Sequence, residues 1–242
     1  ISRAIAKSQK VITVSNYTKA DILKHFPKTP EQKIKVTYEA CDSVESGQLK
    51  LPDTDLSKYG ISKPYLLYIG NAYPHKNIEQ LINIFNTINQ DQPGKYQLVL
   101  VGKEDYFYKR LKAHWQKISP RNNSVIFFGF SPQALLADLY RNAKLYVFPS
   151  LLEGFGLPPL EAMRYDLPVA ASNSSALPEI LQDAAVYFDP SDPQSMLETI
   201  KRGLLHEPLR QKLVANGRIQ VTKFSWLVCA RKTLEIYNEI NK

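Results

Sequence analysis

Two glutamates, Glu153 and Glu161, stand eight positions apart around two glycines and two prolines in the stretch PSLLEGFGLPPLEAM, residues 149–163. The stretch follows an apolar run typical of a strand and leads into a helical pattern. Glycine permits a sharp turn, and proline is tolerated in the first turn of a helix, where the amides have no intrahelical partner. The free amides at that positive end of the helix dipole can bind an anion.

Each glutamate can serve a different part of a ligand bound at this helix end. Glu161, about one turn into the helix, is placed to accept hydrogen bonds from a vicinal diol such as a ribose. Glu153, on the preceding loop, can do the same for another polyol beyond the phosphates. The layout suits a ligand with ribose at one end, a diphosphate in the middle and a sugar at the other. The alternative is a tight connection flanked by two surface glutamates.

A second strand-to-helix junction lies in YIGNAYPHKNIEQLI, residues 68–82, where a predicted strand ends at Gly70 and a helix begins near Asn77. Lys76 at this junction can neutralise a diphosphate leaving group, and Asn77 is suited to capping the helix. A solvated lysine at a helix start is the alternative. Because the positive end of the helix dipole disfavours a cation there, we favour a functional role for Lys76.

Apolar runs alternate with amphipathic helical patterns along most of the chain. The predicted strands are residues 65–70, 96–102, 124–129, 144–150, 167–172 and 185–189, and the predicted helices are residues 77–90, 105–118, 132–142, 157–165, 177–182, 193–205, 207–222 and 226–241. This pattern indicates an α/β fold with a doubly wound, Rossmann-like parallel sheet covered on both faces. Such sheets bind ligands outside the carboxyl ends of their strands.

Composition indicates which kind of partner and which cellular compartment to expect. The chain has 242 residues, of which 44% are apolar, and its net charge of +8 favours anionic partners. No uninterrupted apolar run is long enough for a membrane span. Cys41 and Cys229 have no second Cys or His at metal-ligand spacing, so we expect neither a disulfide nor a zinc site, and a reducing cytoplasm. The aromatic and basic residues at 106–117 indicate a solvated helix with one buried face and not a nucleic-acid site.

The segment EGFGLPPLE resembles the E-x7-E motif of the retaining glycosyltransferases of family four. Other blocks of that family are similar, in the same order, to YLLYIGNAYPHKN, FFGF, YRNAKLYVFPS, PVAASNSSALPEI and DAAVYFDPSDP. The resemblance implies two Rossmann-like domains that face each other, with the nucleotide-sugar donor bound by the C-terminal one. We therefore expect a remnant of the N-terminal acceptor domain in residues 1–46, the donor-binding domain in residues 47–222, and a C-terminal helix in residues 223–242 that crosses back to the N-terminal segment.

The resemblance also implies roles for individual residues. Glu161 would hold the donor ribose, while Glu153, in contact with the transferred sugar, and Lys76, bound to the diphosphate, would be catalytic. The other donor-binding residues would be Gly70, Asn71, His75, Gly129 and Phe130, the last two beside the base, and Gly154, Phe155, Gly156 and Leu157, through their amides. Asn71 and His75 stand where members of the family often carry arginine. Asp166 stands at a common glycine position, which we interpret as a change in turn geometry.

The implied reaction moves a sugar from a nucleoside diphosphate to an acceptor hydroxyl with retention of configuration, in cell-surface glycan or polysaccharide synthesis. We favour mannose from GDP-mannose and expect no cofactor and no metal. The expected partners are the nucleotide sugar, a missing N-terminal acceptor domain and a membrane-surface or lipid-linked acceptor, without nucleic acid, at a cytoplasmic or inner-membrane location. Two alternatives stay open: a nucleotide-sugar-binding module without turnover as this isolated chain, and a basic domain for nucleic acid or a membrane surface.

Overall fold

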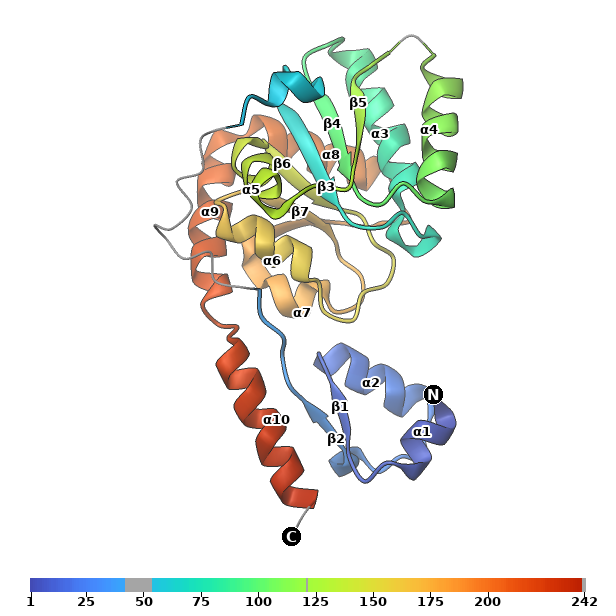
Figure 1. Cartoon of the computed structure of the whole chain (residues 1–242), viewed down its shortest axis with the longest axis vertical. Helices are drawn as coiled ribbons and strands as arrows, with labels where there is room; N and C mark the ends of the chain where they lie inside the picture. Colours follow the sequence, from blue (N-terminus) through green and yellow to red (C-terminus); the bar gives the residue numbers. More distant parts are fainter. Residues whose placement is uncertain (42–53, 121, 241–242) are drawn as a thin grey trace.

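A computed structural model describes residues 1–41, 54–120 and 122–240 of the chain. At its centre lies a six-stranded sheet in which all neighbouring strands are parallel (Figure 1). The strands are β3 (Tyr65–Ile69), β4 (Gln97–Val101), β5 (Val125–Gly129), β6 (Leu145–Phe148), β7 (Val169–Ser172) and β8 (Ala185–Phe188), in the order β5-β4-β3-β6-β7-β8. This order confirms the predicted doubly wound, Rossmann-like sheet.

Helices cover both faces of the sheet, which explains why its strands are apolar along nearly their whole length. One face carries α3 (Ile78–Asp91), α4 (Tyr106–Ile118) and α8 (Pro193–Leu205), and the other carries α5 (Gln133–Asn142), α6 (Leu157–Arg164) and α7 (Leu177–Leu181) (Figure 1). α9 (Glu207–Val221) packs against α6. Short 3-10 turns are η2 (Leu56–Tyr59), η3 (Pro74–Lys76) and η4 (Gln182–Ala184). All eight helices predicted from sequence are present, including α10 (Trp226–Ile240), with ends within one residue of the prediction.

Residues 1–38, here called the N-terminal unit, form a smaller α/β structure beside the main sheet (Figure 1). It consists of α1 (Ser2–Lys7), β1 (Val11–Thr13), α2 (Asn16–His25), the 3-10 turn η1 (Glu31–Lys33) and β2 (Ile34–Val36). β1 and β2 pair in parallel as a two-stranded sheet. The predicted domain boundary between residues 46 and 47 lies outside the described residues.

The C-terminal helix α10 runs back toward the N-terminal unit, as Figure 1 shows. Near the end of α10, Glu239 forms ion pairs with Lys10 at 3.0 Å and Lys35 at 3.6 Å. Ile236 is buried, but the apolar side chains of Leu227 and Tyr237 on the same helix are 69% and 55% exposed. The N-terminal unit therefore meets α10 through ion pairs and does not cover all of its apolar positions. No helix in the described ranges has the length and apolar character needed to cross a bilayer.

The prediction for Asp166 was wrong. Its φ of 57° lies in the left-handed region, so the turn after α6 keeps the conformation that glycine favours. The amides of Asp166 and Leu167 donate to the carbonyls of Met163 and Ala162, each at 3.1 Å, which closes the helix in a Schellman motif. The Asp166 carboxylate also accepts two hydrogen bonds from Arg218 of α9, both at 2.7 Å. Asp166 thus occupies a left-handed position of the kind that glycine favours.

Candidate functional site

The loops that follow β3 and β6 meet at the carboxyl edge of the sheet. β3 and β6 are neighbours in the sheet, yet the helices that follow them, α3 and α6, cover opposite faces (Figure 1). Open α/β sheets bind their ligands at such a switch point. The two loops are joined directly, because the Leu151 amide donates to the His75 carbonyl at 2.7 Å. The two junctions identified in the sequence therefore lie at one place.

Lys76 and Glu153 are brought into contact at this switch point. The lysine Nζ donates to the glutamate Oε1 at 2.6 Å, and the two side chains are only 15% and 13% exposed. The Lys76 Nζ also lies 5.7 Å from the centre of the Phe148 ring at the end of β6. Glu153 is fixed by its own amide, which donates to the Ser175 hydroxyl at 2.9 Å. The site thus holds one cation suited to phosphate and one carboxylate suited to sugar hydroxyls, largely shielded from water.

The loop that follows Glu153 offers backbone amides to a ligand. In the described part of the chain, the N–H groups of Gly154, Phe155, Gly156 and Leu157 form no hydrogen bond. α6 begins at Leu157 with its prolines in the first turn, as predicted. Gly156 has a φ of 108°, and a Cβ there would lie 2.6 Å from Leu177 Cδ2, so the position requires glycine. These amides lie at the positive end of α6, which makes the loop a candidate anion site.

Glu161 on α6 is held by a tyrosine that the sequence analysis did not identify. The Tyr140 hydroxyl donates to Glu161 Oε2 at 2.9 Å. Burial, reinforced by the charge of Glu161, raises the pKa of Tyr140 well above its ordinary value, so the hydroxyl keeps its proton. Tyr140 is itself fixed by stacking on Tyr165, with ring centres 5.1 Å apart. The other carboxylate oxygen, Oε1, makes no hydrogen bond to the described residues and is available to a diol.

The other predicted donor-binding residues lie on the loops after β3 and β5. Gly70 directly follows β3 and lies in a tight space, because its carbonyl accepts from the Tyr108 hydroxyl at 2.9 Å and would lie 2.1 Å from a Cβ on Gly102. Asn71 and His75 are exposed on the loop that leads to Lys76. Gly129 has a φ of 74°, and Phe130 is 86% exposed. In the described ranges, none of the side chains of Asn71, His75 and Phe130 forms an ion pair or hydrogen bond with Lys76, Glu153 or Glu161.

The prediction that Asn77 caps α3 was wrong. Its side chain makes no capping hydrogen bond, and its φ of 58° is left-handed, whereas capping residues normally adopt an extended conformation. The side-chain amide of Asn77 donates instead to the Pro190 carbonyl at 3.0 Å. Asn77 therefore ties the loop that carries Lys76 to the segment that precedes α8.

Three residues that the sequence analysis did not assign to the site, Ser15, Tyr38 and Glu179, support the 154–157 loop. Ser15 donates to the Gly154 carbonyl, Tyr38 packs on the Phe155 ring, and Glu179 binds the start of α2. Ser15 had a sequence signal as a helix cap before NYTKAD, and Glu179 lies in the block PVAASNSSALPEI, whereas Tyr38 had none. Because the ring of Phe155 is buried in this contact, Phe155 can reach a donor only through its backbone.

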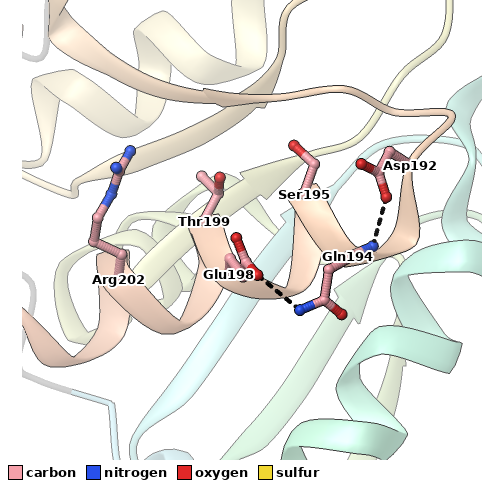
Figure 2. A pocket seen from close by; sticks show the side chains of 6 residues that line it. All are labelled: Asp192, Gln194, Ser195, Glu198, Thr199 and Arg202. Carbon is pink, nitrogen blue, oxygen red and sulfur yellow. Dashed lines mark hydrogen bonds between the residues drawn. The ribbon is translucent and has the colours of Figure 1, made fainter.

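A surface hollow of about 340 Å³ lies along α8, and Figure 2 shows the side chains that line it. They are Asp192, Gln194, Ser195, Glu198, Thr199 and Arg202. Asp192 caps α8 by accepting from the Gln194 amide at 2.9 Å, and the Gln194 side chain donates to Glu198 at 2.7 Å. The hollow shares no residue with the predicted site. No group of three or more His, Cys, Asp or Glu side chains that could hold a metal ion is found among the described residues.

Comparison with known proteins relates this geometry to a family. The family model of the glycosyl transferases group 1 matches residues 53–220. The chain is similar to the O-antigen chain mannosyltransferase B of Escherichia coli, with 32% identity over 243 residues that cover 98% of this chain and 62% of that protein. It is also similar to the serotype-specific mannosyltransferase WbdA of Escherichia coli, with 33% identity over 184 residues that cover 76% of this chain and 23% of that protein.

A solved structure with the same fold is that of HepE from Anabaena, in complex with UDP and glucose. The two folds align with a TM-score of 0.79 and 18% sequence identity, over 97% of this chain and 64% of HepE. The chain thus spans less than two thirds of the length of HepE and of the two mannosyltransferases.

Proposed function

Because this chain belongs to the group 1 glycosyltransferases, we propose that it binds the nucleoside-diphosphate sugar donor of a retaining glycosyl transfer reaction. The observation that carries the proposal is the meeting of Lys76, Glu153 and the free amides of residues 154–157 at the switch point of the sheet. In this proposal Lys76 and the amides bind the diphosphate. Glu153 binds the sugar, and Glu161 accepts hydrogen bonds from the ribose.

The chain would assist the departure of the diphosphate by electrostatics. Negative charge develops on the diphosphate as its bond to the sugar breaks, and the Lys76 ammonium and the loop amides are already in place to stabilise it. The acceptor hydroxyl forms its bond to the same carbon on the face that the diphosphate leaves and passes its proton to the departing phosphate oxygen, so the configuration is retained. Glu153 accepts hydrogen bonds from sugar hydroxyls and orients the ring. Because Glu153 pairs with Lys76 in the free protein, donor binding requires the lysine to take the diphosphate as a new partner.

For the whole protein, we propose transfer of mannose from GDP-mannose during synthesis of a cell-surface glycan. The similarity to two mannosyltransferases of Escherichia coli, one of them named for the O-antigen chain, supports this sugar and this acceptor class. The HepE complex with UDP and glucose supports binding of a nucleotide and a sugar on this fold. We place acceptor binding on a further domain, with a membrane-surface or lipid-linked acceptor at the cytoplasmic side, so that this chain alone binds donor without transferring sugar.

Calorimetric titration of the chain with UDP-, GDP- and ADP-sugars tests the proposal. We expect saturable binding of one donor class, with GDP-mannose bound most tightly. A chain that binds none of these donors would contradict donor binding.

Incubation of the chain and its donor with lipid-linked and soluble acceptors tests the proposal that this chain alone does not transfer sugar. Efficient transfer to one acceptor would show that acceptor binding needs no further domain.

A further inference from the structure

The start of α2 contacts the loop that carries the free amides. Ser15, which precedes α2, is fully buried, and its hydroxyl donates to the Gly154 carbonyl at 2.7 Å. The same hydroxyl oxygen accepts from the Thr18 amide at 3.1 Å and so caps the helix. The Thr18 hydroxyl lies 3.3 Å from the Gly154 carbonyl as a second donor. Two hydroxyls of the N-terminal unit therefore hold one carbonyl of the loop.

This contact fixes the direction of one amide in the candidate anion site. A trans peptide is planar, and its C=O and N–H groups point in opposite directions. With the Gly154 carbonyl held by Ser15, the N–H of Phe155 points away from Ser15, and it has no hydrogen-bond partner among the described residues. Rotation of this peptide turns about ψ of Gly154, where glycine is permissive, and φ of Phe155, and it would replace the N–H with a carbonyl that repels an anion. The hydrogen bond from Ser15 opposes that rotation.

The ring of Phe155 attaches the loop at a second point. Phe155 is 3% exposed, and its ring centre lies 6.2 Å from that of Tyr38 and 5.4 Å from that of Phe224. Tyr38 belongs to the N-terminal unit, and Phe224 lies two residues before the start of α10. Both the backbone and the side chain of the loop are therefore held from outside the main sheet.

Glu179 on α7 holds the start of α2 in the position that this contact needs. Its carboxylate accepts from the amides of Asn16 and Tyr17, both at 2.8 Å, and from the Tyr38 hydroxyl at 2.9 Å. Burial alone would raise the pKa of Glu179, but these hydrogen bonds outweigh it and lower the pKa below the ordinary 4.5. A charged carboxylate at the positive end of α2 is favourable. Glu179 thus fixes α2, and α2 places Ser15 against Gly154.

From these contacts we propose that Ser15 is a positioning residue of the donor site, which holds the Gly154 carbonyl so that the Phe155 amide faces the diphosphate of the donor. The inference rests on the proposed function, because it assigns the 154–157 loop to the diphosphate. It adds that the N-terminal unit contributes to donor affinity without touching the donor. By thermodynamic reciprocity, diphosphate binding then strengthens the attachment of the N-terminal unit to the loop.

The test compares diphosphate and nucleoside binding in four variants of the chain. Calorimetry with UDP, GDP and ADP, and with uridine, guanosine and adenosine, separates binding of the diphosphate from binding of the base and ribose. Ser15→Ala removes the hydroxyl, and Ser15→Thr keeps it. His206→Ala is a matched control, because it removes only the cap of α9, where His206 Nδ1 accepts from the Leu209 amide at 3.1 Å. Thr18→Val removes the second hydroxyl but leaves the amide that Ser15 caps, and so reports on the contact even if Ser15→Ala does not fold.

For the diphosphate that the wild-type chain binds, we expect Ser15→Ala to weaken binding about three- to tenfold, as the loss of one hydrogen bond predicts. Thr18→Val should weaken it about twofold, because its hydrogen bond is longer. Binding of the matching nucleoside should not change, and Ser15→Thr and His206→Ala should bind like the wild type. Unchanged diphosphate affinity in both Ser15→Ala and Thr18→Val would overturn this inference but leave the proposed function standing. Equal losses of affinity for the diphosphate and the nucleoside would also overturn the role of Ser15. A wild-type chain that binds no diphosphate would overturn both this inference and the proposed function.

Discussion

The Lys76 Nζ lies 2.6 Å from Glu153 Oε1, so the cation expected to bind the donor diphosphate is already paired with the carboxylate expected to bind the sugar. The two residues stand 77 positions apart and reach each other from the loops after β3 and β6. Both side chains are less than one sixth exposed, at 15% and 13%. In a site so shielded from water, each charge depends strongly on the other.

The first prediction concerns Lys76. Lys76→Met should weaken binding of the nucleoside diphosphate by at least about tenfold, because the phosphate loses a charge-assisted hydrogen bond. The nucleoside should bind as before. Because partly buried charges are screened little by salt, the loss should persist at high ionic strength. Calorimetry at two salt concentrations measures both effects.

Lys76→Met also leaves Glu153 without its cation, so a structural effect must be separated from the loss of a phosphate ligand. The double variant Lys76→Met with Glu153→Gln serves as the control, because it has no unpaired charge. If the double variant binds the diphosphate as tightly as the wild type, Lys76 does not bind phosphate.

The second prediction separates the two glutamates. Glu153→Gln should leave binding of the free nucleoside diphosphate intact or tighten it, because Lys76 loses a competing anion, and should weaken only the sugar-bearing donor. Glu161→Gln should weaken both ligands, since the ribose loses a charged acceptor whose hydrogen bond is worth about 1.5–3 kcal/mol. Titration of each variant with the free diphosphate and with the sugar-bearing donor measures the difference. Equal losses for both ligands in both variants would refute the two assignments.

The third prediction concerns the pH dependence of stability. A carboxyl group with a lowered pKa in the folded protein contributes stability above its unfolded pKa and loses that contribution as the pH falls through the folded value. For Glu179, whose ordinary pKa is 4.5, the contribution should be complete at neutral pH and decline below about pH 4.5. Its partner Tyr38, with a pKa raised to about 12 by burial and by Glu179, stays protonated throughout this range.

Glu179→Gln is the variant that tests this, because glutamine keeps an acceptor oxygen but does not titrate. The wild type should exceed the variant in melting temperature at pH 7, and the difference should shrink toward pH 4 and below. Thermal unfolding of both proteins across this range measures it. A difference that stays constant with pH would mean that the charge of Glu179 does not stabilise the start of α2.

The fourth prediction concerns the turn at Asp166. Asp166→Gly and Asp166→Ala both remove the ion pair with Arg218, so the two variants differ mainly in the backbone. At a φ of 57°, glycine is unstrained, whereas alanine costs about 1–2 kcal/mol. The glycine variant should therefore be the more stable in urea unfolding by roughly this amount, reduced by the greater entropy of its unfolded chain. Equal stability would contradict a left-handed turn.

The sequence alone determined the fold class and the elements of the main domain. Apolar runs and helical periodicity are local properties, so the six strands of the sheet and the helices around it followed from them, with helix ends correct to within one residue. The sequence also singled out the loop of residues 154–157, because Gly156 and the prolines after Leu157 encode a tight turn into a helix. These features depend on a few neighbouring residues, which a sequence presents together.

Tertiary structure decided which side chains meet. The hydrogen bond from Ser15 to Gly154 joins residues 139 positions apart, and the pair of Lys76 and Glu153 joins two separate loops. Such contacts depend on how the strands are ordered in the sheet, and no local pattern records that order. The same holds for Asn77 and Asp166, where residue type indicated a cap and an altered turn. At both positions the backbone is left-handed and the side chain binds a distant partner, the Pro190 carbonyl for Asn77 and Arg218 for Asp166. Residue type alone specified neither feature.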